Sequence, residues 1–366
     1  MMKDISCYTD HDSHRSILSI LVPTADVDRD DLVLLSEMLH LAPETGLKGS
    51  YLALAGLSLS FRPVVLGKKN ALLVAMDQTE DKSLTYLFKD PYRQVGEVLS
   101  HLLKEGFAKE DSVLAQAKRR VLRRHPLPAD RIAYENRLPL ALVVPDAERL
   151  PERKLADVEK ALSCFASSQV LKVYSGSAKR DFSLPYPSFS KAEDFSAVKD
   201  IVIKEKSDGE SLLLELSHRP LSSLEDFFSL LSAYETFKRS CSLYFRRMML
   251  ADIDYRLCPV SPEKSAIVLS FASDNLSLLR RQIPFKAKES LPFLYDRARS
   301  DDVLFRQEEL LLNIDRRRYL SLLLSLALLS LPPDGLFVEH KGEEAKDIYE
   351  SMKIEAIAWA TLGGRK

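Results

Sequence analysis

Histidine and cysteine are the residues of this chain most able to bind a metal ion or act as nucleophiles, and they are scattered. Of the seven histidines, only His11 and His14 lie close together, in the acidic stretch TDHDSH. That stretch has the residue types of a metal site, but it belongs to a polar N-terminus, and we interpret it as a solvated segment. His340 begins an H-x-x-E-E pattern that lacks the second histidine of a zinc-binding helix, so we interpret it as an acidic helix start.

Other catalytic signatures are absent from the sequence. It contains no G-x-G-x-x-G or G-x-x-x-x-G-K-[ST] loop for phosphates and no G-x-S-x-G turn for a nucleophilic serine. The four cysteines form no C-x-x-C pair, which favours free thiols in a reducing compartment. Because the N-terminus is polar and resembles no signal peptide, we expect a cytoplasmic protein. We expect no cofactor and no bound metal.

A basic cluster, consisting of Lys118, Arg119, Arg120, Arg123 and Arg124, is predicted at the end of a helix. Arg119 and Arg123 are four residues apart, as are Arg120 and Arg124, so each pair shares a helical face. Cations are favourable near a helix C-terminus, and one interpretation is a solvated face. The alternative is contact with an acidic partner or peptide through Arg119 and Arg123. The net charge of −1 and the lack of an RNP-like motif argue against nucleic-acid binding.

The longest apolar run, YLSLLLSLALLSL at 319–331, is shorter than the ~20 residues that a membrane-spanning helix needs. Three arginines precede it and two prolines follow it. We interpret it as a buried core helix and expect no membrane association, since it lacks the polar face of an interfacial helix.

The order of predicted elements repeats in the two halves of the chain. In the first half we expect strands at 17–23, 51–61, 71–77 and 170–176, with helices at 28–41, 91–104, 109–125, 129–142 and 152–167. In the second half we expect strands at 200–206, 211–218, 255–261, 265–273 and 354–362, with helices between them, one opened by a capping box of Ser222 and Glu225. The Ser- and Pro-rich stretch 181–199 has no periodicity, so we predict that it links two similar domains, 1–180 and 200–366.

The passage from the first strand into the first helix resembles the M16 (insulinase-like or pitrilysin-like) metallopeptidases. The first helix of that family carries an inverted zinc motif, H-x-x-E-H, whose glutamate activates a metal-bound water. In ILSILVPTADVDRDDLVLLSEMLHL, Glu37 aligns with that glutamate, whereas Leu34 and Met38 stand at the histidine positions. The third family ligand is a glutamate on a later helix, where EDSVLAQAKRRVLRRH offers Gln116 and arginines. The resemblance implies that all three metal ligands are lost.

A second stretch resembles the family segment S-x-L-F…R…G-L-A-Y, whose arginine and tyrosine contact bound peptide. Here CSLYFRRMMLADIDY matches at its Leu-Tyr pair and at Tyr255. Met248 occupies the arginine position, and Arg246 and Arg247 come just before it. The resemblance therefore implies Arg246, Arg247 and Tyr255 as candidate contacts with a peptide or a partner.

The resemblance is strongest to the inactive bacterial YfmF-like subgroup, which also lacks the zinc motif and is linked to elongation factor P modification. It implies an α+β chain of two tandem M16-like (LuxS/MPP-like) α/β domains, each a mostly antiparallel sheet covered by helices. It also implies a non-catalytic subunit or peptide-binding partner in a heterodimer with an active M16-type peptidase, self-association being the alternative. Two rival functions stay open, a divergent active hydrolase and a helix-rich adaptor unrelated to M16.

Overall fold

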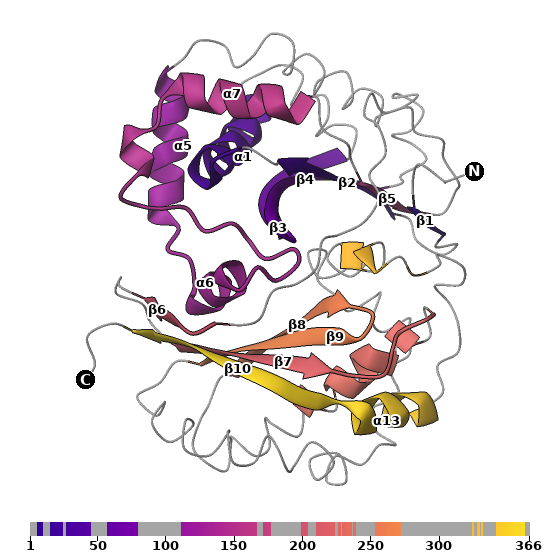
Figure 1. The fold of residues 1–366 in the computed structure, drawn as a ribbon. Coiled ribbons are helices and arrows are strands. Elements are labelled where there is room, and N and C mark those ends of the chain that lie inside the picture. Colours follow the sequence, from indigo (N-terminus) through magenta and orange to yellow (C-terminus); the bar gives the residue numbers. More distant parts are fainter. Residues whose placement is uncertain are drawn as a thin grey trace. The chain divides into compact units, whose positions relative to one another are not determined.

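A computed structural model gives the fold of the chain (Figure 1). The residues that it describes are 6–9, 15–24, 27–44, 57–79, 111–166, 171–176, 199–203, 210–223, 226–227, 229–235, 237–238, 253–271, 324–325, 328–329, 331 and 342–362. The predicted helix at 91–104 and most of the predicted helices in 275–331 lie outside these residues. No helix in the described part is long and apolar enough to cross a membrane.

Two compact units divide the chain. The first comprises Met1–His125 and Leu142–Glu193, and the second comprises Pro126–Ala141 and Asp194–Lys366. The predicted boundaries at 180 and 200 stay predictions, because nearly all of the stretch between them lies outside the described residues. The segment 126–141 comes from the first half of the sequence and yet is part of the second unit.

The first unit is built on a five-stranded sheet. In spatial order its strands are β1 (Ser6–Thr9), β5 (Leu171–Gly176), β2 (Arg15–Thr24), β4 (Lys69–Thr79) and β3 (Leu57–Leu66). β1 is parallel to β5, and all other neighbours are antiparallel. β3 and β4 form a hairpin whose turn includes Gly67 at φ 57°, a conformation that glycine adopts without a Cβ clash. This order leaves β3 at an edge of the sheet.

Helix α1 (Arg29–Glu44) packs against β3, α5 (Asp111–Arg123) and α7 (Leu155–Ala166). It begins where the sequence predicts, because Asp28 Oδ1 accepts the N–H of Asp30 at 2.9 Å and the first turn carries Asp30 and Asp31. Every residue from Asp30 to Leu39 is buried, so the helix is enclosed on all sides. The sheet and the two helices together therefore enclose α1 within the first unit.

The second unit contains a sheet of the same topology. In spatial order its strands are β6 (Ile201–Ile203), β10 (Lys353–Leu362), β7 (Glu210–Ser217), β9 (Lys264–Phe271) and β8 (Ile253–Ser261). β6 is parallel to β10 and the other neighbours are antiparallel, as in the first sheet. The repeated order of elements in the sequence is therefore a repeated sheet topology, and the predicted α+β fold with mostly antiparallel sheets and helices is confirmed.

Helix α6 (Pro128–Glu135) packs on the second sheet, against β6, β7, β9 and β10. Its buried residues are Pro128, Ala129, Ile132, Ala133 and Tyr134. Arg256 of β8 binds Asp130 at 3.0 Å, which ties the helix to the edge of the sheet. The helix predicted at 129–142 is shorter than expected, because Arg137 and Leu140 take positive φ angles of 55° and 61° that no α-helix tolerates.

The predicted capping box is displaced by one residue. Ser223 Oγ accepts the N–H of Asp226 at 3.0 Å, and Asp226 Oδ2 accepts the N–H of Ser223 at 3.1 Å. This reciprocal pattern is that of a capping box, so Ser223 and Asp226 take the roles assigned to Ser222 and Glu225. The sequence SSLED offers both registers, and Asp226 is selected because it also binds Arg219 at 2.7 Å. In the same unit, α13 (Gly342–Ser351) begins just after His340, where the acidic residues predicted a helix start.

Candidate functional site

The three positions aligned with the zinc motif lie together in the buried part of α1. Leu34 and Met38 are completely buried, and only 3% of the surface of Glu37 is exposed. A buried ionised carboxylate needs a cation or several hydrogen-bond donors, because its removal from water costs several kcal/mol. The partner of Glu37 therefore determines what this site can do.

Arginines from α5 and its C-terminal end hold the Glu37 carboxylate. Arg124 Nη1 lies 2.8 Å from Oε2 and its Nη2 lies 3.4 Å from Oε1, a two-pronged contact. Arg120 Nη1 adds a contact of 3.5 Å to Oε1. Two guanidinium groups thus supply the positive charge at the motif's glutamate.

The basic cluster divides into residues that bind other parts of the first unit and residues that stay exposed. Arg120 and Arg124 bind Glu37, and Lys118 Nζ donates to the backbone oxygens of Pro151 and Arg153 at 2.8 and 2.5 Å. These three residues therefore have partners within the first unit, although the side chain of Arg124 stays 68% exposed. Arg119 and Arg123 are exposed, as a partner contact would require.

The residues around Glu37 do not fit the zinc ion that the M16 resemblance implies. Leu34 has no donor atom, and Met38 offers only a thioether, which is a poor ligand for zinc compared with imidazole or thiolate. Both oxygens of Glu37 already accept from guanidinium groups. A zinc ion beside the guanidinium groups of Arg120 and Arg124 would also meet electrostatic repulsion. The described residues contain no other group of three His, Cys, Asp or Glu side chains arranged for a metal.

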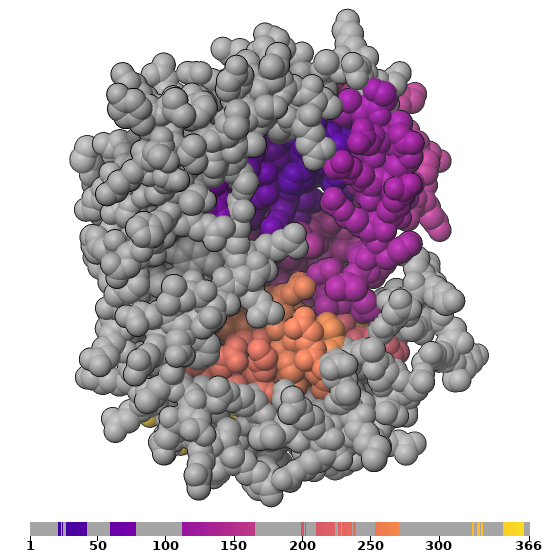
Figure 2. All heavy atoms as spheres, turned by 180° about the vertical axis from the view of Figure 1, so that it is seen from behind, coloured from indigo at the N-terminus to yellow at the C-terminus, as the bar shows by residue number. Residues whose placement is uncertain are grey.

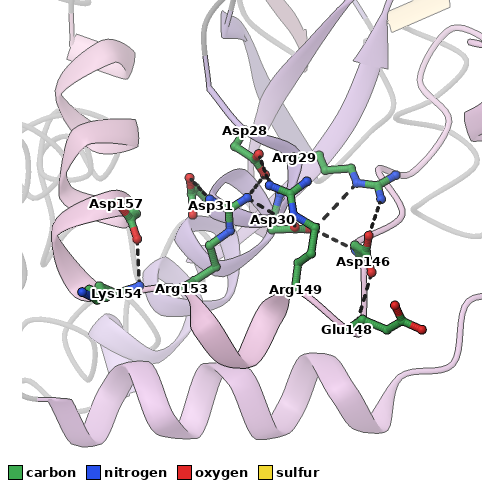
Figure 3. Close-up of polar contacts among 10 residues, drawn as sticks. All are labelled: Asp28, Arg29, Asp30, Asp31, Asp146, Glu148, Arg149, Arg153, Lys154 and Asp157. Atoms are coloured by element: carbon green, nitrogen blue, oxygen red, sulfur yellow. Dashed lines mark hydrogen bonds and ion pairs between the residues drawn. The ribbon is translucent and has the colours of Figure 1, made fainter.

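A network of aspartates and arginines surrounds the N-terminus of α1 (Figure 3). Arg153 Nη2 lies 2.6 Å from Asp28 Oδ1 and 3.5 Å from Asp30 Oδ2, and its Nη1 lies 3.4 Å from Asp31 Oδ2. Arg149 binds Asp28 at 3.0 Å. The network connects α1 to the segment around the short 3-10 helix η1 (Leu150–Glu152), which precedes α7.

Within this network, neighbouring carboxyls have opposite pKa shifts. Burial works against ionisation of Asp28, but the N–H of Asp30 and the guanidinium groups of Arg153 and Arg149 outweigh it and hold the pKa of Asp28 below its usual range. Burial raises the pKa of Asp31 to about 6, with Arg153 opposing the shift and nearby aspartates adding to it. Asp31 Oδ1 is buried without a hydrogen-bond partner among the described residues. Asp31 is therefore the one member of the pair whose charge is poorly compensated.

The substitution Asp31→Asn is expected to flatten the pH dependence of stability. Since the pKa of Asp31 is raised in the folded state, its effect on stability is most favourable below its ordinary pKa of 3.8 and becomes unfavourable as the pH rises through about 6. The variant should therefore gain more in melting temperature over the wild type at pH 7.5 than at pH 4.5. Thermal melts followed by far-UV circular dichroism at both pH values test this, and an equal shift at both would contradict it.

The remaining sequence candidates lie in the second unit. Tyr255 is on the edge strand β8, where only 5% of its surface is exposed and its N–H binds Asp254 Oδ1 at 2.9 Å. Its side chain has little surface to offer a peptide in this conformation. Arg246 and Arg247 lie outside the described residues.

A serine–histidine pair bears on the rival hydrolase function. His218 Nε2 lies 2.8 Å from Ser265 Oγ, and Nδ1 lies 2.9 Å from the backbone oxygen of Arg219. Burial lowers the pKa of His218, so the ring is neutral at pH 7. Ser265 is completely buried, however, and a substrate cannot reach its hydroxyl. The pair joins the residue that follows β7 to β9 and has the features of a structural contact.

Comparison with solved structures identifies the fold. A putative M16-like peptidase from Alicyclobacillus acidocaldarius superposes with a TM-score of 0.51 at 11% identity, over 98% of this chain and 96% of that one. A protease from Helicobacter pylori gives a TM-score of 0.57 at 9% identity, over 98% and 96%. The periplasmic protease PqqL from Escherichia coli gives 0.52 at 12% identity, over 97% of this chain and 44% of that longer one.

The similarity is one of structure. No protein-family model matches the sequence, and no curated protein matches it. Two units of one repeated α+β topology nevertheless align with M16-type peptidases over nearly the whole chain. This chain therefore has the fold of the M16 peptidases.

Proposed function

We propose that this chain is a catalytically silent M16-type subunit that acts on a partner, foremost an active M16-type peptidase chain. The contact between Glu37 and the two arginines carries the proposal. A metallopeptidase glutamate must be free to take a proton from a metal-bound water, whereas this one neutralises guanidinium groups in a buried site. The sequence resemblance to YfmF-like proteins suggests a process to test first, the modification of elongation factor P.

The outer face of α5 supports a role through a partner. Arg119 and Arg123 are exposed there, and Leu122 between them is 40% exposed. Violet atoms of this part of the chain lie at the surface in the space-filling view (Figure 2). Two exposed arginines suit an acidic protein surface, because arginine is enriched at contacts between proteins.

Charge reversal on this face, Arg119→Glu with Arg123→Glu, is expected to abolish the complex with an M16-type chain that has an intact H-x-x-E-H motif. Wild-type protein should co-elute with that chain in size-exclusion chromatography with light scattering and should change its peptidase rate. The matched control is Lys154→Glu with Lys160→Glu, two exposed lysines of the same unit. The control changes the net charge by the same amount, but its two lysines lie outside α5. It should therefore leave the complex intact.

A homodimer is the second candidate, because a silent chain can also pair with itself. Light scattering separates the two outcomes by mass. A dimer of this chain that persists in the presence of the active chain, with unchanged peptidase activity, contradicts the proposed partnership.

A further inference from the structure

The edge strand β3 raises the question of whether this fold can bind an extended peptide. An edge strand offers unpaired backbone N–H and C=O groups to which a peptide can add as a further strand. In an antiparallel pair, alternate residues direct these groups toward the neighbouring strand and away from it. The outward-directed residues of β3 decide whether a peptide can pair with it.

Phe61 is an outward-directed residue whose backbone N–H and carbonyl both face side chains of α1. His40 Nε2 lies 2.8 Å from its carbonyl oxygen and 3.2 Å from its nitrogen, and Ser36 Oγ donates to the same carbonyl at 3.1 Å. Both side chains come from α1, one helical turn apart. The imidazole ring also meets the Phe61 ring edge-on, with centroids 5.5 Å apart. His40 Nε2 donates to the carbonyl in one tautomer and accepts from the N–H in the other, and Ser36 binds the carbonyl in both. In either tautomer α1 therefore occupies the outward side of Phe61.

Pro63 is the next outward-directed residue, two positions along the strand. It has no N–H to donate, and its carbonyl oxygen accepts the N–H of Val143 at 3.0 Å. The neighbouring Leu142 forms an antiparallel bridge with Val64. A short piece of the same chain thus lies against β3 as an added strand would.

We infer that the edge of β3 is closed to strand addition by the chain itself. Leu142 and Val143 occupy the position of an incoming strand, and Ser36 and His40 occupy the position before it. A peptide would have to break at least three hydrogen bonds in order to pair there, and at Pro63 it would still find no donor. This inference rests on the proposed function in one respect. If the chain acts on a partner, a closed β3 edge means that it binds the folded surface of that partner and not an extended peptide.

Amide hydrogen exchange tests the closure directly. Val143 lies outside any helix or long strand, yet its N–H should exchange at least ~100-fold more slowly than an unprotected amide. Ser36→Ala with His40→Ala should speed exchange at Phe61 at least ~10-fold and leave Val143 unchanged. The control is Ser163→Ala, a serine that binds only its own helix through the Lys160 carbonyl. Unprotected exchange at Val143 in the wild type would overturn the inference.

Peptide binding provides the second test. The probe is a fluorescein-labelled ten-residue peptide of alternating valine and threonine with terminal lysines, followed by fluorescence anisotropy. Wild-type protein should show no saturable binding, whereas a variant with Ser36→Ala, His40→Ala, Pro63→Val and Val143→Pro should bind. Saturable wild-type binding that slows exchange of the β3 amides refutes closure. If the fourfold variant fails to fold, the wild-type exchange result decides alone.

The two proposals fail independently. Protected Val143 and Phe61 amides without any partner complex would refute the proposed function and leave the closed edge standing. A partner complex together with peptide pairing along β3 would do the reverse.

Discussion

Zinc is expected to bind and stabilise a variant with Leu34→His, Met38→His, Arg120→Glu and Arg124→Gln, and to leave the wild type unchanged. The two histidines would be four residues apart on one helical face, the spacing that places both imidazoles on one metal. Loss of the two arginines frees the Glu37 carboxylate. The glutamate introduced at position 120 supplies a third metal ligand, because the Arg120 side chain that it replaces reaches to 3.5 Å from Glu37. Zinc at one hundred times its Kd should add about 2.7 kcal/mol to the free energy of unfolding.

The measurements for this variant are elemental analysis after metal-free purification and melting curves with and without zinc. Without zinc it should be less stable than the wild type, because two polar rings replace completely buried apolar side chains. The control carries only the Arg120→Glu and Arg124→Gln changes and should take up no zinc. A folded fourfold variant that binds no zinc would show that Glu37 is out of register with the motif.

Removing both arginines, as Arg120→Ala with Arg124→Ala, is expected to destabilise the first unit by about 2–3 kcal/mol at pH 8. The variant leaves the buried Glu37 carboxylate without a cation. The loss falls below that of a fully buried pair because the Arg124 side chain is 68% exposed and water can replace part of its contact. Adding Glu37→Leu should recover most of the loss, since it removes the uncompensated charge.

The single tryptophan makes this measurement specific to one unit. Trp359 belongs to β10 of the second unit, so its fluorescence reports unfolding there, whereas far-UV circular dichroism reports both units. In urea, the arginine variant should lose circular dichroism signal earlier and keep the wild-type fluorescence midpoint. The control, Arg119→Ala with Arg123→Ala, should stay within about 0.5 kcal/mol of the wild type. Equal losses for the two pairs would rule out a special role for Glu37.

Local signals in the sequence account for the parts of the site that were predicted. The helix start at Asp28 and the leucine periodicity place Glu37 on α1, because caps and amphipathic spacing act within a few residues. The sequence also carries a signal for α5. Arg120 and Arg124 lie next to the buried stripe of Ala117 and Val121, so their guanidinium groups can reach α1 from the border of that stripe.

Contacts between distant parts of the chain account for what was missed. Asp28, Asp30 and Asp31 have the pattern of an ordinary acidic helix start, and nothing near them indicates that Arg149 and Arg153 complete the network. The same holds for segment 126–141, whose apolar helix has a local pattern that fits either sheet. Only the packing of the whole chain assigns it to the second unit.

Helix α6 leaves the ribosome before any strand of the sheet that it covers. The first sheet has all its strands once Gly176 is made, but α6 also packs on β10, which ends at Leu362. At ~5–20 residues per second, synthesis from Glu135 to Leu362 takes roughly 10–45 s, during which the apolar side of α6 has no sheet to cover it. A chain that stalls in this interval displays that helix, which makes 126–141 a natural recognition point for chaperones and quality-control proteases.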